Sequence, residues 1–222
     1  MAGTLALVGG AEWTDGCDFD AGLLAASGGS RVLVVPTAAA YENPGDAIAR
    51  ATEWLAALGA EVDVLGVYRR SAADDPAAID LVRGASMIYL SGGSPMHLRS
   101  VLKDTALWDE IVQRWNEGAT LAGSAEGATV LCAHMVDTRG GAFTVGLDLI
   151  DTLTVIPRYD HWSDDMWHRT VRLAPSNLAV VGIDERTAVI WDGTAWTAAG
   201  VGRVVVHRDG RRAELSDLPA PA

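Results

Sequence analysis

The sequence predicts an α/β fold: a three-layer sandwich with a largely parallel central sheet and antiparallel strands near the C-terminal end. Three observations lead to this prediction. Short apolar runs alternate with helical patterns as far as Met135. Several of these runs are apolar throughout, as strands buried on both faces of a parallel sheet are. The last third contains short apolar runs separated by glycines, which is typical of antiparallel strands.

The strands are predicted from compact apolar runs that end at glycine or at other turn residues. The clearest is the block of Val32, Leu33, Val34 and Val35. In the first part of the chain we expect strands over residues 5–8, 31–36, 62–67, 87–90 and 120–122. In the last third we expect them over residues 180–183, 188–191, 195–198 and 203–207.

The helices are predicted from apolar residues at helical spacing and from their capping residues. Asn43 can cap a helix that has Pro44 at its first position and ends at Gly59. Its apolar stripe contains Ile48, Ala51, Trp54, Leu55 and Leu58. Further helices are expected over residues 76–82, from about residue 95, and over residues 107–115 and 127–135.

Length and composition indicate a single soluble domain. The 222 residues are 49% hydrophobic and 21% charged, which is ordinary for a globular protein. We expect the domain to cover residues 1–217, followed by a frayed tail at residues 218–222. Cys17 and Cys132 are the two cysteines, so a disulfide framework is not expected and a cytoplasmic location fits. No secretory leader pattern and no apolar run of the ~20 residues that span a bilayer is present.

The net charge of −12 argues against nucleic acid as a partner, because an acidic surface repels phosphate backbones. The Gly92-Gly93-Ser94 turn is followed by no Gly-Lys-Ser or Gly-Lys-Thr, so it is not a phosphate-binding loop of the usual kind. We therefore expect no cofactor, no membrane and no nucleic acid.

The most informative stretch is residues 121–131, which read as strand, tight turn and helix. We call this segment the elbow. Its turn needs small residues on both sides because the backbone is crowded there, and Gly123 and Gly127 supply them. The residue midway between them is Ala125. It is expected to point into the cleft above the strand ends, where ligands of open α/β sheets bind.

The elbow and several other segments resemble the peptidase S51 family, which includes dipeptidase E and cyanophycinase and is related to the class I glutamine amidotransferases. The other landmarks are Val8-Gly9-Gly10, Pro36-Thr37-Ala38-Ala39, Leu90-Ser91-Gly92-Gly93-Ser94 and Gly182-Ile183-Asp184-Glu185-Arg186-Thr187-Ala188. The resemblance covers most of the chain and implies a class I glutamine amidotransferase-like, flavodoxin-like fold. Family members often form dimers, so it also implies that a homodimer is one state to test.

The sequence departs from the family at two functional positions. Family members typically read Gly-Ser-Ser-Ala-Gly-Ala at the elbow, which places the nucleophilic serine on Ala125, and Glu126 on an alanine. The family's histidine falls on Arg158, and His161 lies three residues further on. A methyl group cannot attack a carbonyl, and an arginine stays protonated and cannot act as a base. Losing the nucleophile normally removes about a million-fold in rate.

Two functional interpretations follow from the resemblance. In the first, the chain does not hydrolyse its ligand and binds a small molecule or peptide end in the elbow cleft. Residues expected to contact that ligand are Gly92, Gly93, Ser94, Tyr159 and Trp162. In the second, the chain is a hydrolase with a displaced set of catalytic residues, Ser124 or Glu126 acting with His161. A structural subunit of a larger complex is a third interpretation, which predicts a large exposed apolar patch.

Two local ambiguities stay open in the sequence. The Glu126 carboxylate could favour a cationic or hydroxyl-bearing ligand, or it could cap the elbow helix and face solvent. Acidic residues and histidines also cluster at Asp160, His161, Asp164, Asp165 and His168. Metal binding would suit such groups. However, Ser163 as an N-cap with acids in the first helical turn explains them without a metal, and we expect none.

Overall fold

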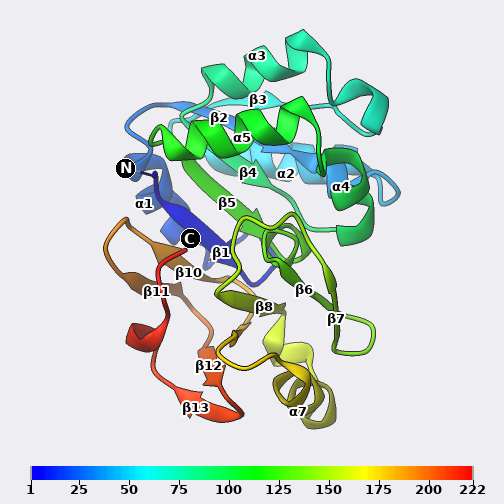
Figure 1. Ribbon diagram of the computed structural model, residues 1–222. Coiled ribbons are helices and arrows are strands. Elements are labelled where there is room, and N and C mark those ends of the chain that lie inside the picture. The colour runs from blue at the N-terminus through cyan, green and yellow to red at the C-terminus, as the bar shows by residue number, and fades with distance from the viewer. Residues whose placement is uncertain (1, 222) are drawn as a thin grey trace.

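The structure, a computed structural model, describes residues 2–221 (Figure 1). Its main sheet has seven strands in the order β11-β10-β1-β5-β4-β2-β3. Five neighbouring strands are parallel: β1 (Leu5–Val8), β2 (Arg31–Val35), β3 (Glu61–Val64), β4 (Met87–Leu90) and β5 (Thr120–Ser124). Strands β10 (Thr187–Trp191) and β11 (Trp196–Gly200) extend the sheet antiparallel beyond β1. The largely parallel sheet is confirmed.

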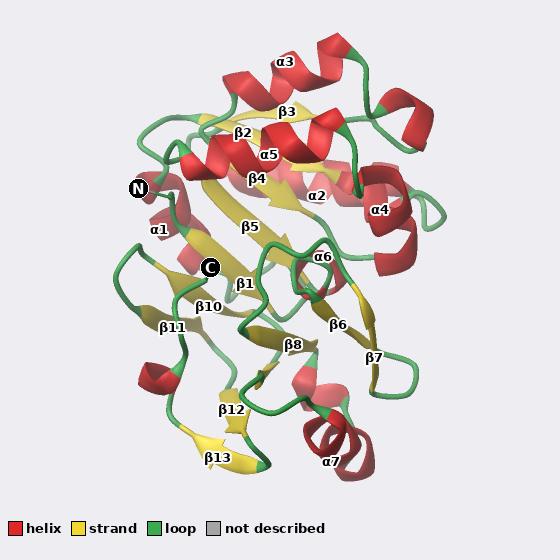
Figure 2. Ribbon diagram, in the orientation of Figure 1, coloured by secondary structure: helices red, strands yellow, loops and turns green. Residues whose placement is uncertain are grey.

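Helices cover both faces of this sheet (Figure 2). One face carries α1 (Phe19–Ala26) and α2 (Pro44–Ala57). The other carries α3 (Pro76–Gly84), α4 (Pro95–Leu102) and α5 (Ala106–Asn116). Alternate residues of one strand enter the two cores: Leu5 and Leu7 pack on one side, Ala6 and Val8 on the other. This alternation produces the predicted three-layer sandwich.

A second, four-stranded sheet lies beside the first and has the order β13-β12-β9-β8. It consists of β8 (Leu153–Pro157), β9 (Ala179–Ile183), β12 (Val204–Arg208) and β13 (Arg211–Ala213). Helix α7 (Asp164–Leu173) and the hairpin of β6 (His134–Asp137) and β7 (Ala142–Val145) pack against it. The strands expected at residues 180–183 and 203–207 therefore exist, but they belong to this separate sheet.

The prediction of a helix over residues 127–135 is wrong. Helix α6 covers only Glu126–Thr129. Beyond it, the carbonyls of Val130 and Leu131 accept hydrogen bonds from the backbone N–H groups of Leu147 and Leu149. These carbonyls are thus used by a distant segment, and the apolar run is buried without being helical.

Two other expectations need correction. Asn43 occupies the N-cap position of α2 with a φ of 49°, but its side-chain amide donates to the Asp46 carboxylate and caps no backbone N–H. The start of the segment expected to fray is packed, since Leu218 is buried and the Pro219 carbonyl accepts a hydrogen bond from Trp196 Nε1 over 2.7 Å. Its last residue, Ala222, lies outside the described residues. Short 3-10 helices lie at Pro36–Ala39 (η1), Arg70–Ala72 (η2), Tyr159–His161 (η3) and Leu215–Asp217 (η4).

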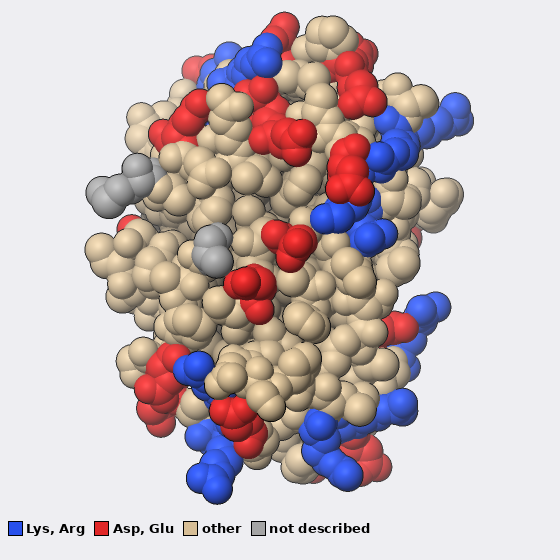
Figure 3. All heavy atoms as spheres, viewed as in Figure 1, with Lys and Arg blue, Asp and Glu red and all other residues tan. Residues whose placement is uncertain are grey.

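Within residues 2–221, no helix is both long and apolar enough to cross a bilayer. On the face drawn in Figure 3, acidic and basic side chains are interspersed. Neither observation tests the expectation that nucleic acid is not a partner, which stays a prediction.

Candidate active site

The elbow forms as the sequence predicts. Strand β5 ends at Ser124, and Ala125 follows with φ 49° and ψ −113°, an unusual conformation for a residue with a side chain. A Cβ atom on Gly123 would lie 2.4 Å from the Gly127 carbonyl oxygen, and one on Gly127 would lie 2.6 Å from the Leu90 carbonyl oxygen. Both flanking positions therefore require glycine, and Ala125 is the residue at the tip.

A cavity of about 320 Å³ lies above the tip. It is bounded by the segments that follow the carboxyl ends of the parallel strands: Glu12 after β1, Ala39 after β2, Gly92 and Gly93 after β4, and Ala125 after β5. This is the position where open parallel sheets bind ligands. The predicted contacts Gly92 and Gly93 line this cavity, as does Arg158.

Arg158 reaches the elbow from the second sheet. Its backbone N–H donates to the Gly9 carbonyl over 2.7 Å, and its φ of 48° turns the chain away from β8. The guanidinium group forms an ion pair with one carboxylate oxygen of Glu126. The other oxygen of Glu126 accepts the Gly93 N–H over 3.2 Å. Glu126 is buried, so its interpretation as a capping carboxylate facing solvent is wrong.

Glu12 makes a similar set of contacts, with Gly92 and Ser124. Its Oε1 accepts the Gly92 N–H over 3.0 Å, and its Oε2 accepts the Ser124 hydroxyl over 2.8 Å. Ser124 is fully buried as the last residue of β5. Sequence reasoning missed Glu12, although it closely follows the Gly9-Gly10 turn at the end of β1. Two carboxylates thus accept the N–H groups of the Gly92-Gly93 turn.

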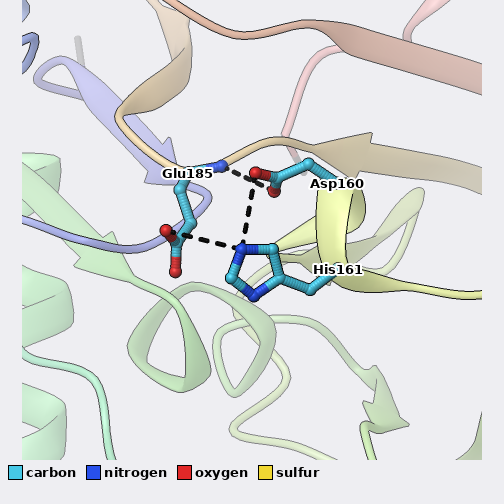
Figure 4. Close-up of side chains that lie close together, drawn as sticks. All are labelled: Asp160, His161 and Glu185. Carbon is cyan, nitrogen blue, oxygen red and sulfur yellow. Dashed lines mark hydrogen bonds and ion pairs between the residues drawn. The ribbon is translucent and has the colours of Figure 1, made fainter.

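His161 lies in η3 with its ring near two acidic groups (Figure 4). Its Nε2 is 3.7 Å from Asp160 Oδ2 and 3.7 Å from Glu185 Oε2. One potential ligand atom from each of the three residues lies within 4.8 Å of the others, so this group could hold a metal ion. Glu185 was not part of the cluster expected from the sequence, because it comes from the distant turn after β9.

The remaining acids of that cluster belong to α7. The Ser163 hydroxyl accepts the Met166 N–H over 3.4 Å, and Asp164 and Asp165 lie in the first turn, so the capping interpretation is confirmed. His168 does not join His161. Its ring stacks on Trp167, with ring centroids 3.7 Å apart, and its Nδ1 lies 2.8 Å from the Asp164 carbonyl oxygen.

Three predicted ligand contacts lie outside the cavity. Ser94 caps α4 by accepting the His97 N–H over 3.3 Å. Tyr159 and Trp162 pack into the apolar cluster between the second sheet and α7. The Tyr159 ring lies where a Cβ on Gly182 would come within 2.5 Å of it. The two aromatic side chains therefore pack against this apolar cluster and do not line the cavity above Ala125.

A buried acid, Asp20, lies close enough to Glu12 to be affected by its charge. Asp20 in α1 is fully buried and accepts a hydrogen bond from Trp54 Nε1 over 2.9 Å. Burial raises the pKa of the Asp20 carboxyl to about 7, the Trp54 hydrogen bond opposes that rise, and the negative charge of Glu12 adds to it. The sequence offered no signal for Asp20, because it occupies an ordinary first-turn position.

Comparisons with known proteins identify the family. The model of Peptidase family S51 matches residues 6–198. A cyanophycinase from Trichormus variabilis is 27% identical over 193 residues, which cover 81% of this chain and 64% of the relative. A cyanophycinase from Synechococcus elongatus is 31% identical over 149 residues, or 60% of this chain and 45% of the relative. The chain thus matches less than two thirds of the length of these curated relatives.

Two solved structures are similar over nearly the whole chain. A peptidase from an acI-B1 Actinobacterium superposes with a TM-score of 0.86 at 31% identity and covers 97% of this chain and 95% of its own. A putative peptidase E protein from Listeria monocytogenes EGD-e superposes with a TM-score of 0.70 at 18% identity, covering 91% of this chain and all of its own, which supports the fold alone. With the family model covering most of the sequence, this chain belongs to peptidase family S51.

Proposed function

We propose that this chain is a non-hydrolytic or repurposed member of the family, which binds a small molecule or peptide end in the cavity above Ala125. One observation carries the proposal. The side chain at the elbow tip is a methyl group, and the N–H groups of Gly92 and Gly93 beside it already donate to Glu12 and Glu126. Acyl transfer requires a nucleophile at the tip and donors aimed at the developing oxyanion.

The charges around the cavity favour a positively charged ligand. A carboxylate near the reacting carbonyl would oppose negative charge on its oxygen, whereas it would attract an amine or guanidinium group. The cavity is lined by four acidic residues, Glu12, Glu42, Asp46 and Glu185, and by two arginines, Arg50 and Arg158. Arg158 is paired with the buried Glu126. The lining therefore has an excess of negative charge.

The alternative hydrolase gains no support from the geometry. Ser124 is buried and donates to Glu12, and Glu126 is engaged by Arg158 and by the Gly93 N–H. Among residues 2–221, neither side chain forms a hydrogen bond with His161. If any activity is found, Glu126→Gln and His161→Ala variants will show whether these groups take part. Unchanged kinetics in both would eliminate this mechanism.

The first experiment compares hydrolysis with that of an authentic cyanophycinase. The purified chain is incubated with Asp-X dipeptides, isoaspartyl peptides and cyanophycin-like polymers. We expect no turnover above the uncatalysed rate. Turnover close to that of the authentic enzyme would overturn the proposal.

The second experiment measures binding of a cationic probe. We expect arginine amide to perturb the NMR signals of Gly92 and Gly93, and the uncharged citrulline amide to perturb them far less. Asp46→Asn should weaken binding of arginine amide, whereas Glu53→Gln on the exposed face of the same helix should not. Equal binding of the two amides would contradict the preference for a cation.

A further inference from the structure

Asp160, His161 and Glu185 converge from two separate loops. Asp160 and His161 belong to η3, after β8, and Glu185 belongs to the turn between β9 and β10. The two carboxylates approach the same imidazole nitrogen, each at 3.7 Å, and Figure 4 shows all three side chains directed toward one point. The fold, and not local sequence, produces this arrangement.

The backbone fixes the two loops relative to each other. The N–H of Glu185 donates to Asp160 Oδ1 over 3.0 Å, which leaves Asp160 Oδ2 on the side of His161. The N–H of His161 donates to the Arg158 carbonyl over 2.8 Å, and the N–H of Arg158 is bonded to Gly9. The backbone of all three residues is thus held in place by hydrogen bonds. This lowers the entropic cost of binding an ion between their side chains.

The charges of this cluster are not balanced by the protein. Within residues 2–221, neither Asp160 nor Glu185 forms an ion pair with a lysine or an arginine. A single Nε2–H could donate to only one of the two carboxylates. Two carboxylates, one exposed at Asp160 and one half-buried at Glu185, share this one imidazole. They therefore leave a negative site, which a divalent cation would neutralise.

We propose that Asp160, His161 and Glu185 bind a divalent transition-metal ion, with Zn²⁺ bound in preference to Mg²⁺. Imidazole and carboxylate ligands suit zinc, whereas Mg²⁺ takes oxygen ligands almost exclusively. At ligand distances of 2.0–2.2 Å, two ligands of a tetrahedral ion lie about 3.4 Å apart. The two separations from His161 Nε2, each 3.7 Å, need to close by about 0.3 Å. All three potential ligand atoms lie within 4.8 Å of one another, so rotation of the exposed side chains brings the two carboxylates together.

The expected site differs from the five-residue cluster that the sequence suggested. His168, Asp164 and Asp165 lie on α7 and do not take part, and Glu185 replaces them. Three protein ligands leave at least one coordination position for water or for a ligand group. Because Glu185 also lines the cavity above Ala125, the ion would lie at the rim of that cavity.

The test is calorimetric titration of the full chain, without a histidine tag and freed of metal by chelation, with ZnCl₂. We expect one saturable site, and at least about tenfold weaker binding for Glu185→Gln and for His161→Ala. The matched control His168→Ala should bind as the unaltered chain does. A hundredfold excess of Mg²⁺ should not displace Zn²⁺.

A second readout identifies the ligands directly. Co²⁺ in place of Zn²⁺ should give visible absorption bands that Glu185→Gln alters and His168→Ala leaves unchanged. Glu185→Gln keeps the backbone N–H that Asp160 accepts, so its thermal midpoint without metal should match that of the unaltered chain. Absence of saturable binding, or binding that survives both Glu185→Gln and His161→Ala, would overturn the site. Neither measurement depends on a ligand in the cavity.

Discussion

The guanidinium group of Arg158 pairs with the buried carboxylate of Glu126, across the interface between the second sheet and the elbow. The resemblance to the family implies that its members have a histidine at the first of these positions and an alanine at the second. The pair brings two charges to the place where the catalytic base and a small residue are expected. It also fastens the loop after β8 to the main sheet.

The interaction energy of Arg158 and Glu126 can be measured by a double-mutant cycle. Arg158→Ala leaves the Glu126 carboxylate buried with the Gly93 N–H as its remaining partner, and we expect a loss of about 1–3 kcal/mol in the free energy of unfolding. The same change should cost less in a Glu126→Gln background, because the buried group is then uncharged. Urea unfolding of the four proteins gives the coupling energy. Strict additivity would show that the two side chains do not interact.

Restoring a serine at the tip should not restore hydrolysis by itself. Ala125→Ser supplies a hydroxyl but leaves Arg158 at the position that the resemblance assigns to the family's histidine, and it leaves the Gly93 N–H bonded to Glu126. We expect no measurable turnover of isoaspartyl peptides or of cyanophycin-like polymers by this single variant. The triple variant Ala125→Ser, Glu126→Ala, Arg158→His should gain activity relative to it. High activity of Ala125→Ser alone would mean that base and donors are already in place.

The glycines of the elbow should tolerate no side chain. A Cβ on Gly127 would lie 2.6 Å from the Leu90 carbonyl oxygen and 2.8 Å from that of Ser91. Both are backbone atoms that cannot move aside cheaply, so Gly127→Ala should destabilise the fold by about 1–3 kcal/mol. Gly22→Ala in α1 is the control, because its added Cβ meets nothing within 4 Å. That change should stabilise by roughly 0.5–1 kcal/mol, and urea unfolding would separate the two.

Stability should depend on pH through Asp20. Its pKa is raised from about 4 in the unfolded chain to about 7 in the folded one, so the folded state holds the proton more tightly. The stabilising contribution is complete below about pH 4 and is lost as the pH rises through 7. Its full size is on the order of 4 kcal/mol.

Asp20→Asn removes this dependence, since the amide stays neutral and can still accept from Trp54. We expect the variant to become progressively more stable than the unaltered chain between pH 4 and pH 8. The exposed neighbour Asp18→Asn should show no such trend. A difference between Asp20→Asn and the unaltered chain that stays constant with pH would contradict the raised pKa.

Local sequence predicted most of the regular structure. Strands β2 and β4 were visible because buried strands are continuously apolar. The helices that begin at Pro44, Pro76 and Pro95 were visible because proline marks a first helical turn. The failed helix over residues 127–135 has a clear physical cause. The run after Thr129 looked helical, but its carbonyls bond to Leu147 and Leu149 instead. A pattern of apolar residues indicates burial, but it does not indicate which backbone groups form hydrogen bonds with each other.

The sequence by itself determined the elbow, because Gly123 and Gly127 at equal distances from Ala125 permit one tight turn, and it determined that the tip side chain is a methyl group. Only the tertiary structure decided what surrounds that tip. The cavity is lined by residues that follow strands far apart in the chain: Glu12, Arg158 and Glu185. The spacing of residues along the sequence does not predict contacts of this kind. The directions of the Glu12 and Glu126 carboxylates are set by the N–H, hydroxyl and guanidinium groups that folding places opposite them.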